Sequence, residues 1–451
     1  MPFDKDVYAP IYRDGRHNAA DYIQAQAERC RECFDPVCED GCPAGVDIPG
    51  FIKAVADGEI GKSYEILRDK NLLPEMCAYV CPSEVQCEGC CVENVFSENP
   101  VPIREIQRYV ARTARQRGLV SLKCGPSTGK RIAVIGAGPA GIACAAKLLQ
   151  LGHAVEVFDL RDSLGGVAES SIPGRRLSSS DFYNEVNAIL KEDCGHSFIF
   201  HPGEGLAPDK TLDAYAREFD AVFLGMGLGR TTSLTNTKPK GVEDAIVFLQ
   251  RSKFEGAEVP ERVAVLGGGN TAMDAATQAI SNGARDVYLV YRRSYKEMPA
   301  WPAERDEALS MGVHFLMLTQ PVDYVLDGDR VRGVRVVRTV LGAPDASGRR
   351  RPETVPNSES VLEVDMVLEA LGQGVAEEVE QLLDGVELTD QRLVGIDQNG
   401  QTSRKGVYAG GDLVNGGATV VQAIAEGMRA AEGIHEFLSL GSGNNAEPTS
   451  P

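Results

Sequence analysis

The sequence predicts an α/β protein with a helical N-terminal domain followed by two Rossmann-like domains. Three observations lead to this prediction. Nine of the twelve cysteines lie before residue 92. A strand, a glycine-rich turn and a helix follow one another from Lys130 to Asp159, and the same succession returns from Arg262 to Tyr291. Units of this kind build parallel sheets that helices cover on both faces.

Length and composition are those of a multidomain globular protein. The chain has 451 residues, of which 43% are hydrophobic, and it contains 48 glycines. This length suffices for two or three domains. We predict a helical domain at 1–123, the first Rossmann-like domain in two parts at 124–242 and 374–440, the second at 243–373, and a disordered polar tail at 441–451.

Charge and hydropathy argue against two classes of function. The chain has 65 acidic and 46 basic residues, and its formal net charge is −19. No cluster of Lys and Arg offsets this charge, so we expect no nucleic-acid binding. No apolar run approaches the ~20 residues of a membrane-spanning helix, and the polar N-terminus does not resemble a signal peptide. We therefore expect a soluble, cytoplasmic protein.

The N-terminal region is predicted to be helical at 19–33, 51–57 and 103–117, with too little apolar sequence for a large core. A metal centre would supply the missing cohesion. Zinc sites also use cysteine pairs and are the alternative. Two [4Fe-4S] clusters are favoured because both cysteine runs contain a Cys-Pro step, as bacterial ferredoxins do. Cys77 and Cys90 accompany the second run. The runs are Cys30-x2-Cys33-x4-Cys38-x3-Cys42 and Cys81-x5-Cys87-x3-Cys91.

The stretch from Lys130 to Asp159 has every part of a dinucleotide-binding unit. An apolar strand at 131–135 precedes the turn, and an Ala-rich helix at 142–151 follows it. The three glycines of the turn allow a tight turn, the approach of a pyrophosphate and close helix packing. N–H groups at the helix start attract phosphate, and Asp159, about 20 residues on, accepts hydrogen bonds from ribose hydroxyls. The turn is Gly136, Ala137, Gly138, Pro139, Ala140 and Gly141.

A second unit of this kind has a strand at 263–266 and a helix at 273–282. Its next strand, 286–291, leads into Arg292 and Arg293, where the first unit has an aspartate. Two guanidinium groups without a carboxylate favour a 2′-phosphate, hence NADP, with NAD as the alternative. Alanine replaces the third glycine, which the motif allows. The binding turn comprises Gly267, Gly268, Gly269, Asn270, Thr271 and Ala272.

The segment from 313 to 371 is predicted to form an antiparallel insert. Alternating apolar residues indicate strands at 331–340 and 361–367. The stretch at 342–356 is polar and contains several Gly and Pro residues, so we expect an exposed hairpin loop.

The cysteine spacing and the dinucleotide-binding motifs together resemble one family. From about residue 20 to 440, the chain resembles the small subunit of bacterial glutamate synthase. It is also similar to the N-terminal half of dihydropyrimidine dehydrogenase and to the large subunit of NADH-dependent ferredoxin:NADP oxidoreductase. The resemblance implies an iron–sulfur N-terminal domain, an FAD-binding first Rossmann-like domain and a nicotinamide-binding domain inserted into it.

The resemblance also implies which side chains bind the clusters. In dihydropyrimidine dehydrogenase the two cysteine runs exchange ligands, and one cluster has a glutamine ligand. Cys77 falls outside the pattern, and Cys90 stays open as an alternative ligand. Carried onto this chain, one [4Fe-4S] cluster would be bound by Cys30, Cys33, Cys38 and Cys91. The other would be bound by Cys42, Cys81, Cys87 and Gln107.

Three further segments match the flavin-binding pattern of such proteins. Gly165 and Gly166 follow the second strand of the first unit, where the chain passes the pyrophosphate. Gly411 and Asp412 end the segment 407–412, and the aspartate is expected to hold the ribityl hydroxyls. Ala418 and Thr419 open a helix predicted at 420–432, whose N-terminal dipole favours negative charge on the flavin ring.

We therefore expect an NAD(P)H-dependent FAD and iron–sulfur oxidoreductase subunit. No Ser/His/Asp or Cys/His nucleophile set is visible, so the chemistry belongs to the cofactors. Hydride from NADPH would reduce FAD, and single electrons would pass through the clusters to a large catalytic subunit or a ferredoxin-type acceptor, or in the reverse direction. A ferredoxin:NADP oxidoreductase subunit and a dihydropyrimidine dehydrogenase input subunit are alternatives to a glutamate synthase small subunit. An alternative of another class is a redox-sensing or scaffold iron–sulfur protein.

Overall fold

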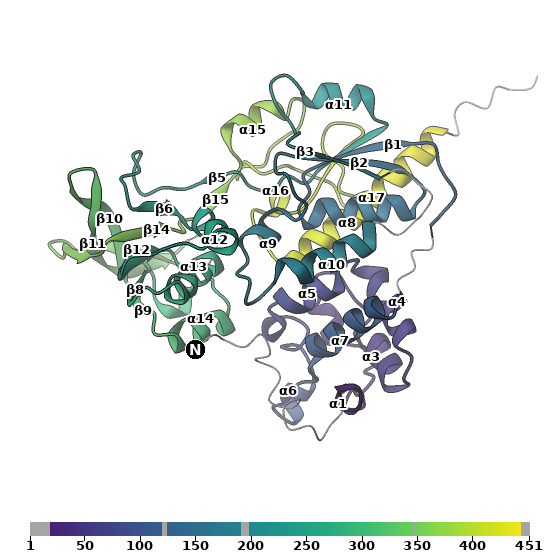
Figure 1. The fold of residues 1–451 in the computed structure, drawn as a ribbon, viewed down its shortest axis with the longest axis horizontal. Helices are drawn as coiled ribbons and strands as arrows, with labels where there is room; N and C mark the ends of the chain where they lie inside the picture. The colour runs from purple at the N-terminus through teal and green to yellow at the C-terminus, as the bar shows by residue number, and fades with distance from the viewer. Residues whose placement is uncertain (1–18, 120–123, 191–197, 346–347, 443–451) are drawn as a thin grey trace, which may run out of the picture. The chain divides into compact units, whose positions relative to one another are not determined.

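The computed structural model describes residues 19–119, 124–190, 198–345 and 348–442. By its internal contacts the chain divides into two units (Figure 1). The first contains the residues up to 169, 175–229 and those from 375 on, and the second contains 170–174 and 230–374. The second unit thus begins earlier than residue 243, the predicted start of the inserted domain. The predicted tail at 441–451 lies outside the described residues, apart from the last two residues of a helix.

The N-terminal part of the first unit is a helical module around a compact apolar core. Phe51, Ile52, Leu67 and Ile106 are fully buried in it, and several cysteines of both runs pack against the same core. The helix predicted at 19–33 ends earlier, because 30–36 form an irregular loop instead. The helices are α1 (Ala19–Ala27), α2 (Val37–Asp40), α3 (Ile48–Ala56), α4 (Ile60–Lys70), α5 (Pro74–Val80), α6 (Glu93–Phe96) and α7 (Ile103–Gln116).

The rest of the first unit is built on a parallel sheet in the order β16-β4-β1-β2-β3. Helix α17 packs along α8 (Figure 1). The two backbones approach closely: a Cβ atom on Gly427 of α17 would lie 2.1 Å from the carbonyl oxygen of Ala140. The strands are β1 (Arg131–Ile135), β2 (Ala154–Asp159), β3 (Phe198–Pro202), β4 (Ala221–Leu224) and β16 (Val407–Ala409). The helices are α8 (Pro139–Gln150), α9 (Gly166–Ser171), α10 (Ser179–Leu190), α11 (Leu212–Glu218), α15 (Glu377–Leu382), α16 (Asp412–Asn415) and α17 (Val420–Ser442).

The second unit contains a parallel sheet in the order β6-β14-β7-β8-β9. Helices α12 and α13 pack against each other beside this sheet. At the chain crossings, β5 and β15 pair with each other in antiparallel fashion. The strands are β5 (Arg230–Thr231), β6 (Val242–Asp244), β7 (Arg262–Leu266), β8 (Asp286–Val290), β9 (His314–Leu316), β14 (Met366–Glu369) and β15 (Gln373–Gly374). The helices are α12 (Ala245–Phe254), α13 (Asn270–Ser281) and α14 (Pro302–Ser310).

The insert of the second unit is an antiparallel sheet of β10 (Thr319–Asp327), β11 (Arg330–Pro344), β12 (Arg350–Thr354) and β13 (Ser360–Glu363). Two predictions within it need correction. The strand expected at 361–367 is two strands, because β13 pairs with β11 while β14, buried throughout, joins the parallel sheet. The loop expected at 342–356 is largely paired strand, the end of β11 and β12.

Candidate cofactor sites

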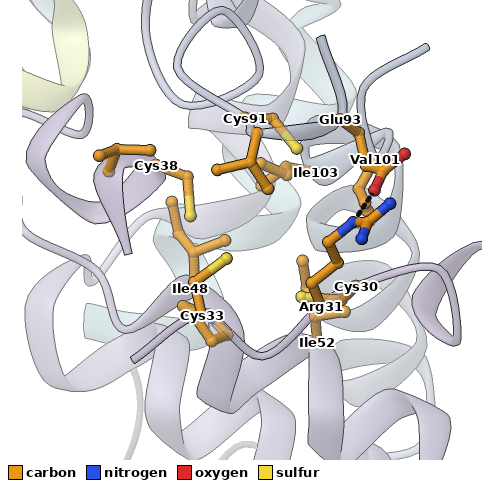
Figure 2. A pocket seen from close by; sticks show the side chains of 13 residues that line it. Cys30, Arg31, Cys33, Cys38, Ile48, Ile52, Cys91, Glu93, Val101 and Ile103 are labelled. Atoms are coloured by element: carbon orange, nitrogen blue, oxygen red, sulfur yellow. Dashed lines mark hydrogen bonds and ion pairs between the residues drawn. The ribbon is translucent and has the colours of Figure 1, made fainter. Parts of the chain in front are cut away.

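Cysteines from both runs meet in the helical module. Cys30, Cys33 and Cys38 of the first run and Cys91 of the second line one pocket. Figure 2 shows their sulfur atoms around it, with Ile48, Ile52 and Ile103 completing an apolar lining. At the rim Arg31 is ion-paired with Glu93. Four thiols in an apolar pocket are the donor set of a [4Fe-4S] cluster, so these residues fit that group.

Local backbone features bring the first-run cysteines to this pocket. The N–H of Cys30 closes the last turn of α1 by donating to Ala27, and Glu32 in the following loop has a positive φ of 48°. Cys38 lies within α2. Burial first, and then the neighbouring Cys30 and Cys91, raise the pKa of the Cys38 thiol to about 12. The thiols of Cys30, Cys38 and Cys91 are therefore mutual neighbours.

A second group of thiols gathers from Cys42, Cys81 and Cys87. Burial is the main cause that raises the pKa of Cys87 well above its ordinary value, and Glu88, Cys81 and Cys42 add to it. Burial also raises the pKa of Cys42, where Cys81 contributes as well. The structure thus brings these three of the four predicted ligands of the second cluster into mutual range.

The fourth predicted ligand, Gln107, lies on α7. Its Nε2 donates a hydrogen bond to the carbonyl oxygen of Pro74 at 2.8 Å. One turn earlier, Arg104 donates to the carbonyl oxygen of Cys81 at 3.3 Å. Residues three apart share a helix face, so this end of α7 contacts the segment that carries Cys81. The Pro74 contact orients the amide and leaves Oε1 as the atom that iron would take.

Two cysteines near the second group have other surroundings. Cys77 is fully buried, and its thiol contacts Asn71 Oδ1 at 3.8 Å. A hydrogen bond with Cys77 is the first cause, and burial the second, that raise the pKa of Cys81 well above its ordinary value. Cys90 is exposed. Among the residues that the structure describes, no three Cys, His, Asp or Glu side chains converge on the position of a single metal ion.

The first glycine-rich turn connects β1 to α8. Gly136 has a φ of +103°. A Cβ atom on Gly141 would lie 1.9 Å from the carbonyl oxygen of Gly136, so only glycine allows the helix to pack this closely. Gly138 is the N-cap of α8, followed by Pro139 at the first helical position. The nearest atom to a Cβ on Gly138 would be 3.9 Å away, which leaves its backbone accessible to a pyrophosphate.

Asp159 ties this turn to the end of β2. Its carboxylate accepts hydrogen bonds from the N–H groups of Ala137, at 2.7 Å, and Arg161, at 2.8 Å. The N–H of Gly165 in turn donates to the carbonyl oxygen of Ala137 at 2.7 Å. A Cβ on Gly166 would lie 3.0 Å from the Cα of Gly138. The segment predicted to pass the pyrophosphate therefore lies directly against the glycine-rich turn.

The segment 407–412, which also matches the flavin-binding pattern, leads from β16 towards α17 and contains Gly411 and Asp412. Oδ1 of Asp412 accepts a long hydrogen bond from the N–H of Ala418 at 3.4 Å, and burial raises the pKa of Asp412. The hydroxyl of Thr419 accepts from the N–H of Gln422 at 3.3 Å and so caps the start of α17. Asp412 and the helix start thus share one small region.

Glu426 of α17 is a residue of this region that sequence reasoning missed. Its carboxylate accepts from the N–H of Gly411 at 2.7 Å and from the side chains of Asn415, at 3.1 Å, and Gln422, also at 3.1 Å. It is 7% exposed. The sequence carries no signal for this role, because Gly411 and Asn415 become neighbours of Glu426 only in the folded protein.

The second glycine-rich turn connects β7 to α13. A Cβ on Gly267, whose φ is +141°, would lie 2.3 Å from the carbonyl oxygen of Ala370. Gly269 is the N-cap of α13 and has nothing within 4 Å of its Cβ position. Asn270 Oδ1 accepts from the N–H of Trp301 at 3.0 Å. Thr271 follows within the first turn of the helix and Ala272 is buried. The free approach at Gly269 fits a pyrophosphate.

The sequence prediction treated the two arginines after β8 as equivalent, but their surroundings differ. Arg292 is exposed. The side chain of Arg293 is 7% exposed and forms an ion pair with Asp345 at 2.7 Å. Its Nε also donates to the carbonyl oxygen of Arg350 at 2.8 Å. These contacts already use two nitrogens of its guanidinium. Arg292 is therefore the more accessible of the two predicted phosphate ligands, and binding of a 2′-phosphate by Arg293 stays a prediction.

Comparison with protein families matches both parts of the chain. Residues 13–119 match the family described as dihydropyrimidine dehydrogenase domain II, 4Fe-4S cluster. Residues 130–427 match the pyridine nucleotide-disulphide oxidoreductase family. The helical module is therefore an iron–sulfur domain, and the rest has the flavin- and nicotinamide-binding fold predicted from the sequence. No helix in the described ranges has the length and apolar character needed to cross a bilayer.

Individual relatives agree with this assignment. The glutamate synthase [NADPH] small chain of Escherichia coli is 38% identical, over 96% of this chain and 94% of its own. The NADP(+)-dependent formate dehydrogenase subunit beta of Moorella thermoacetica is 35% identical, over 90% of this chain and 60% of its own. Mycobacterium tuberculosis FprA, solved in complex with NADPH, superposes with a TM-score of 0.55 at 16% identity, covering 72% of this chain and 88% of its own. The last shows the shared fold alone.

Proposed function

The chain belongs to the family of the glutamate synthase small chains, and from that premise we propose that it is an electron-input subunit that accepts hydride from NADPH on FAD and delivers single electrons through two [4Fe-4S] clusters. A bound flavin can take two electrons as hydride and release them one at a time, and iron–sulfur clusters carry single electrons.

The convergence of Cys30, Cys33, Cys38 and Cys91 is the observation that carries this proposal. These four thiols come from two runs, 30–42 and 81–91, that residues 43–80 separate, and they line one pocket with apolar neighbours. A set of this kind binds a cluster rather than catalysing hydrolysis or group transfer. In a chain that also has two dinucleotide-binding turns, the cluster gives electrons from a nicotinamide a path out of the flavin domain.

The chain's own residues supply binding and orientation. The N–H groups at the start of α8 would bind the flavin pyrophosphate, with Asp159 fixing the turn and Asp412 on the ribityl side. In the second unit the start of α13 would hold the coenzyme pyrophosphate, and exposed Arg292 would pair with the 2′-phosphate. This phosphate distinguishes NADPH from NADH.

For the second cluster we propose Cys42, Cys81, Cys87 and Gln107 as ligands. Three of them are neighbouring thiols, and Gln107 lies on the helix that contacts the Cys81 segment. By their names, the relatives described above are the small chain of a glutamate synthase and the beta subunit of a formate dehydrogenase. We therefore propose a larger partner subunit as the electron acceptor, with a glutamate synthase large subunit as the first candidate.

This function is tested by reducing the protein with NADPH under anaerobic conditions and following the flavin and the clusters separately. NADPH should bleach the flavin absorbance, and electron paramagnetic resonance should then detect reduced clusters. The Cys38→Ala variant should still show flavin reduction by NADPH while transferring electrons to a one-electron acceptor dye much more slowly. Protein that binds iron but no flavin, or whose flavin NADPH leaves oxidised, would instead support a sensing or scaffold role.

A further inference from the structure

The antiparallel sheet of the second unit has no role in the function proposed above. It nevertheless forms several hydrogen bonds with the loop that follows β8. Three consecutive carbonyl groups of this loop accept hydrogen bonds from the insert. The N–H of Thr319 donates to Tyr291 at 3.0 Å, and the N–H of Leu318 donates to Arg293 at 3.0 Å. Between them, the hydroxyl of Thr339 on β11 donates to the carbonyl oxygen of Arg292 at 2.7 Å.

An ion pair adds a fourth connection between the sheet and this loop. Asp345, directly after β11, pairs with Arg293 at 2.7 Å. The carbonyl oxygen of Arg350, at the start of β12, accepts from Nε of the same guanidinium at 2.8 Å. Charge-assisted bonds of this kind have strict geometry, especially with little solvent present. The backbone on both sides of Arg292 is therefore fixed, while the side chain of Arg292 itself is exposed.

We propose that the antiparallel sheet is a template for coenzyme selection, in which Thr339 and Asp345 are positioning residues that hold Arg292 for the 2′-phosphate of NADPH. This inference rests on the proposed function, since it requires NADPH as the electron donor. A loop already held in its binding conformation loses less conformational entropy when the ligand arrives. NADH has no 2′-phosphate, so its binding should not depend on where Arg292 is held.

Thr339→Val is the most selective test, because valine keeps the shape of the buried side chain and removes only the hydroxyl. We expect kcat/KM for flavin reduction by NADPH to fall roughly tenfold, the value of one lost hydrogen bond, mainly through KM. The same ratio for NADH should change less than about twofold. Thr354→Val is the matched control: Thr354 pairs with Thr339 across β11 and β12, but it is exposed and should leave both coenzymes unaffected.

The ion pair calls for a double variant, because removal of Asp345 alone would leave a buried unpaired charge and could unfold the unit. The pair Arg293→Met and Asp345→Leu removes both charges together. It should weaken NADPH in the same selective way and keep FAD bound. The single variant Arg293→Lys retains the positive charge opposite Asp345. It should therefore keep part of the preference for NADPH over NADH that the double variant loses.

A double-mutant cycle of Thr339→Val and Arg292→Ala distinguishes a positioning role of Thr339 from a general packing role. If Thr339 acts through Arg292, then Thr339→Val should have almost no further effect on NADPH once Arg292 is alanine. Equal losses for NADPH and NADH, or full additivity with Arg292→Ala, would overturn the inference and leave the proposed function intact. A wild-type protein that reduces its flavin equally well with both coenzymes would instead reject NADPH selectivity, and with it the premise of the inference.

Discussion

The side chain of Glu185 on α10 binds the N-terminal turn of α5 that contains Glu75. Its two carboxylate oxygens accept hydrogen bonds from the N–H groups of Glu75 and Met76, both at 2.6 Å. The carboxylate of Glu75 is in turn ion-paired with Arg115 of α7 at 2.8 Å. Both acids are buried. This network connects the flavin domain to α5, whose C-cap is Cys81, a proposed cluster ligand.

Glu185 predicts a pH dependence of stability. Burial first, and then the charge of Glu75, raises the pKa of Glu185 from 4.5 to about 8. At pH values between 4.5 and 8, the folded protein retains a proton on Glu185 that the unfolded chain releases. The contribution of Glu185 to the free energy of unfolding is therefore fully present below pH 4.5 and is lost as the pH rises towards 8. The expected slope is at most about 1.4 kcal/mol per pH unit. Urea unfolding across this range would measure it.

The variant Glu185→Gln has no titrating group and should show a flatter profile of unfolding free energy against pH. Glu65→Gln, at an exposed position of α4, is the control and should follow the wild-type profile. Parallel profiles for wild type and Glu185→Gln would show that the buried acid does not titrate in this range.

The cysteine assignment predicts metal content. Anaerobically prepared protein should contain about eight irons and eight sulfides per chain, as expected for two cubane clusters. Cys38→Ala should lose about half of the iron and destabilise the helical module, because cluster binding and folding are coupled. Cys90→Ala, at an exposed thiol, is the control. Loss of iron in the control would move Cys90 into the ligand set, and stoichiometric zinc would reject the clusters.

Gln107 predicts a shift in potential rather than a loss of cluster. A neutral amide is a weaker donor to iron than a thiolate, so Gln107→Cys should keep both clusters and lower the reduction potential of one. Redox titration followed by electron paramagnetic resonance would measure this. Gln116→Leu, exposed near the end of the same helix, should have no effect. If Gln107→Leu leaves both potentials and spectra unchanged, Gln107 is not a ligand.

From the hydrogen bonds of Glu426 we predict that this residue strengthens flavin binding. In Glu426→Gln, one oxygen could still accept from Gly411, but the new NH2 group would face the amides of Asn415 and Gln422. A hydrogen bond to a charged group contributes about 1.5–3 kcal/mol, so we expect FAD to bind at least roughly tenfold more weakly. Release of fluorescent flavin on dilution is the measurement. Glu432→Gln, which alters an exposed residue of the same helix, should match wild type, and equal flavin release from both variants would contradict the role of Glu426.

The sequence alone determined the features that depend on local chemistry. The glycines of both turns were recognisable because their neighbours leave no space for a side chain, as at Gly141 and Gly267. The cysteine runs were recognisable because cluster ligation needs thiolates at short spacings. The fold class followed from these motifs, since each strand–turn–helix unit specifies its own parallel pairing.

Tertiary structure decided the features that depend on contacts between distant residues. Arg292 and Arg293 are equivalent as residue types. They differ because the fold brings Asp345, 52 residues away, and the carbonyl oxygen of Arg350 to Arg293, while Arg292 stays exposed. The apolar stretch at 361–367 carried no sign that β13 and β14 belong to different sheets. Glu185 and Glu426 were invisible as functional residues for the same reason. The energy of a buried charge is set by the partners that the fold brings to it, and those partners are not its neighbours in the chain.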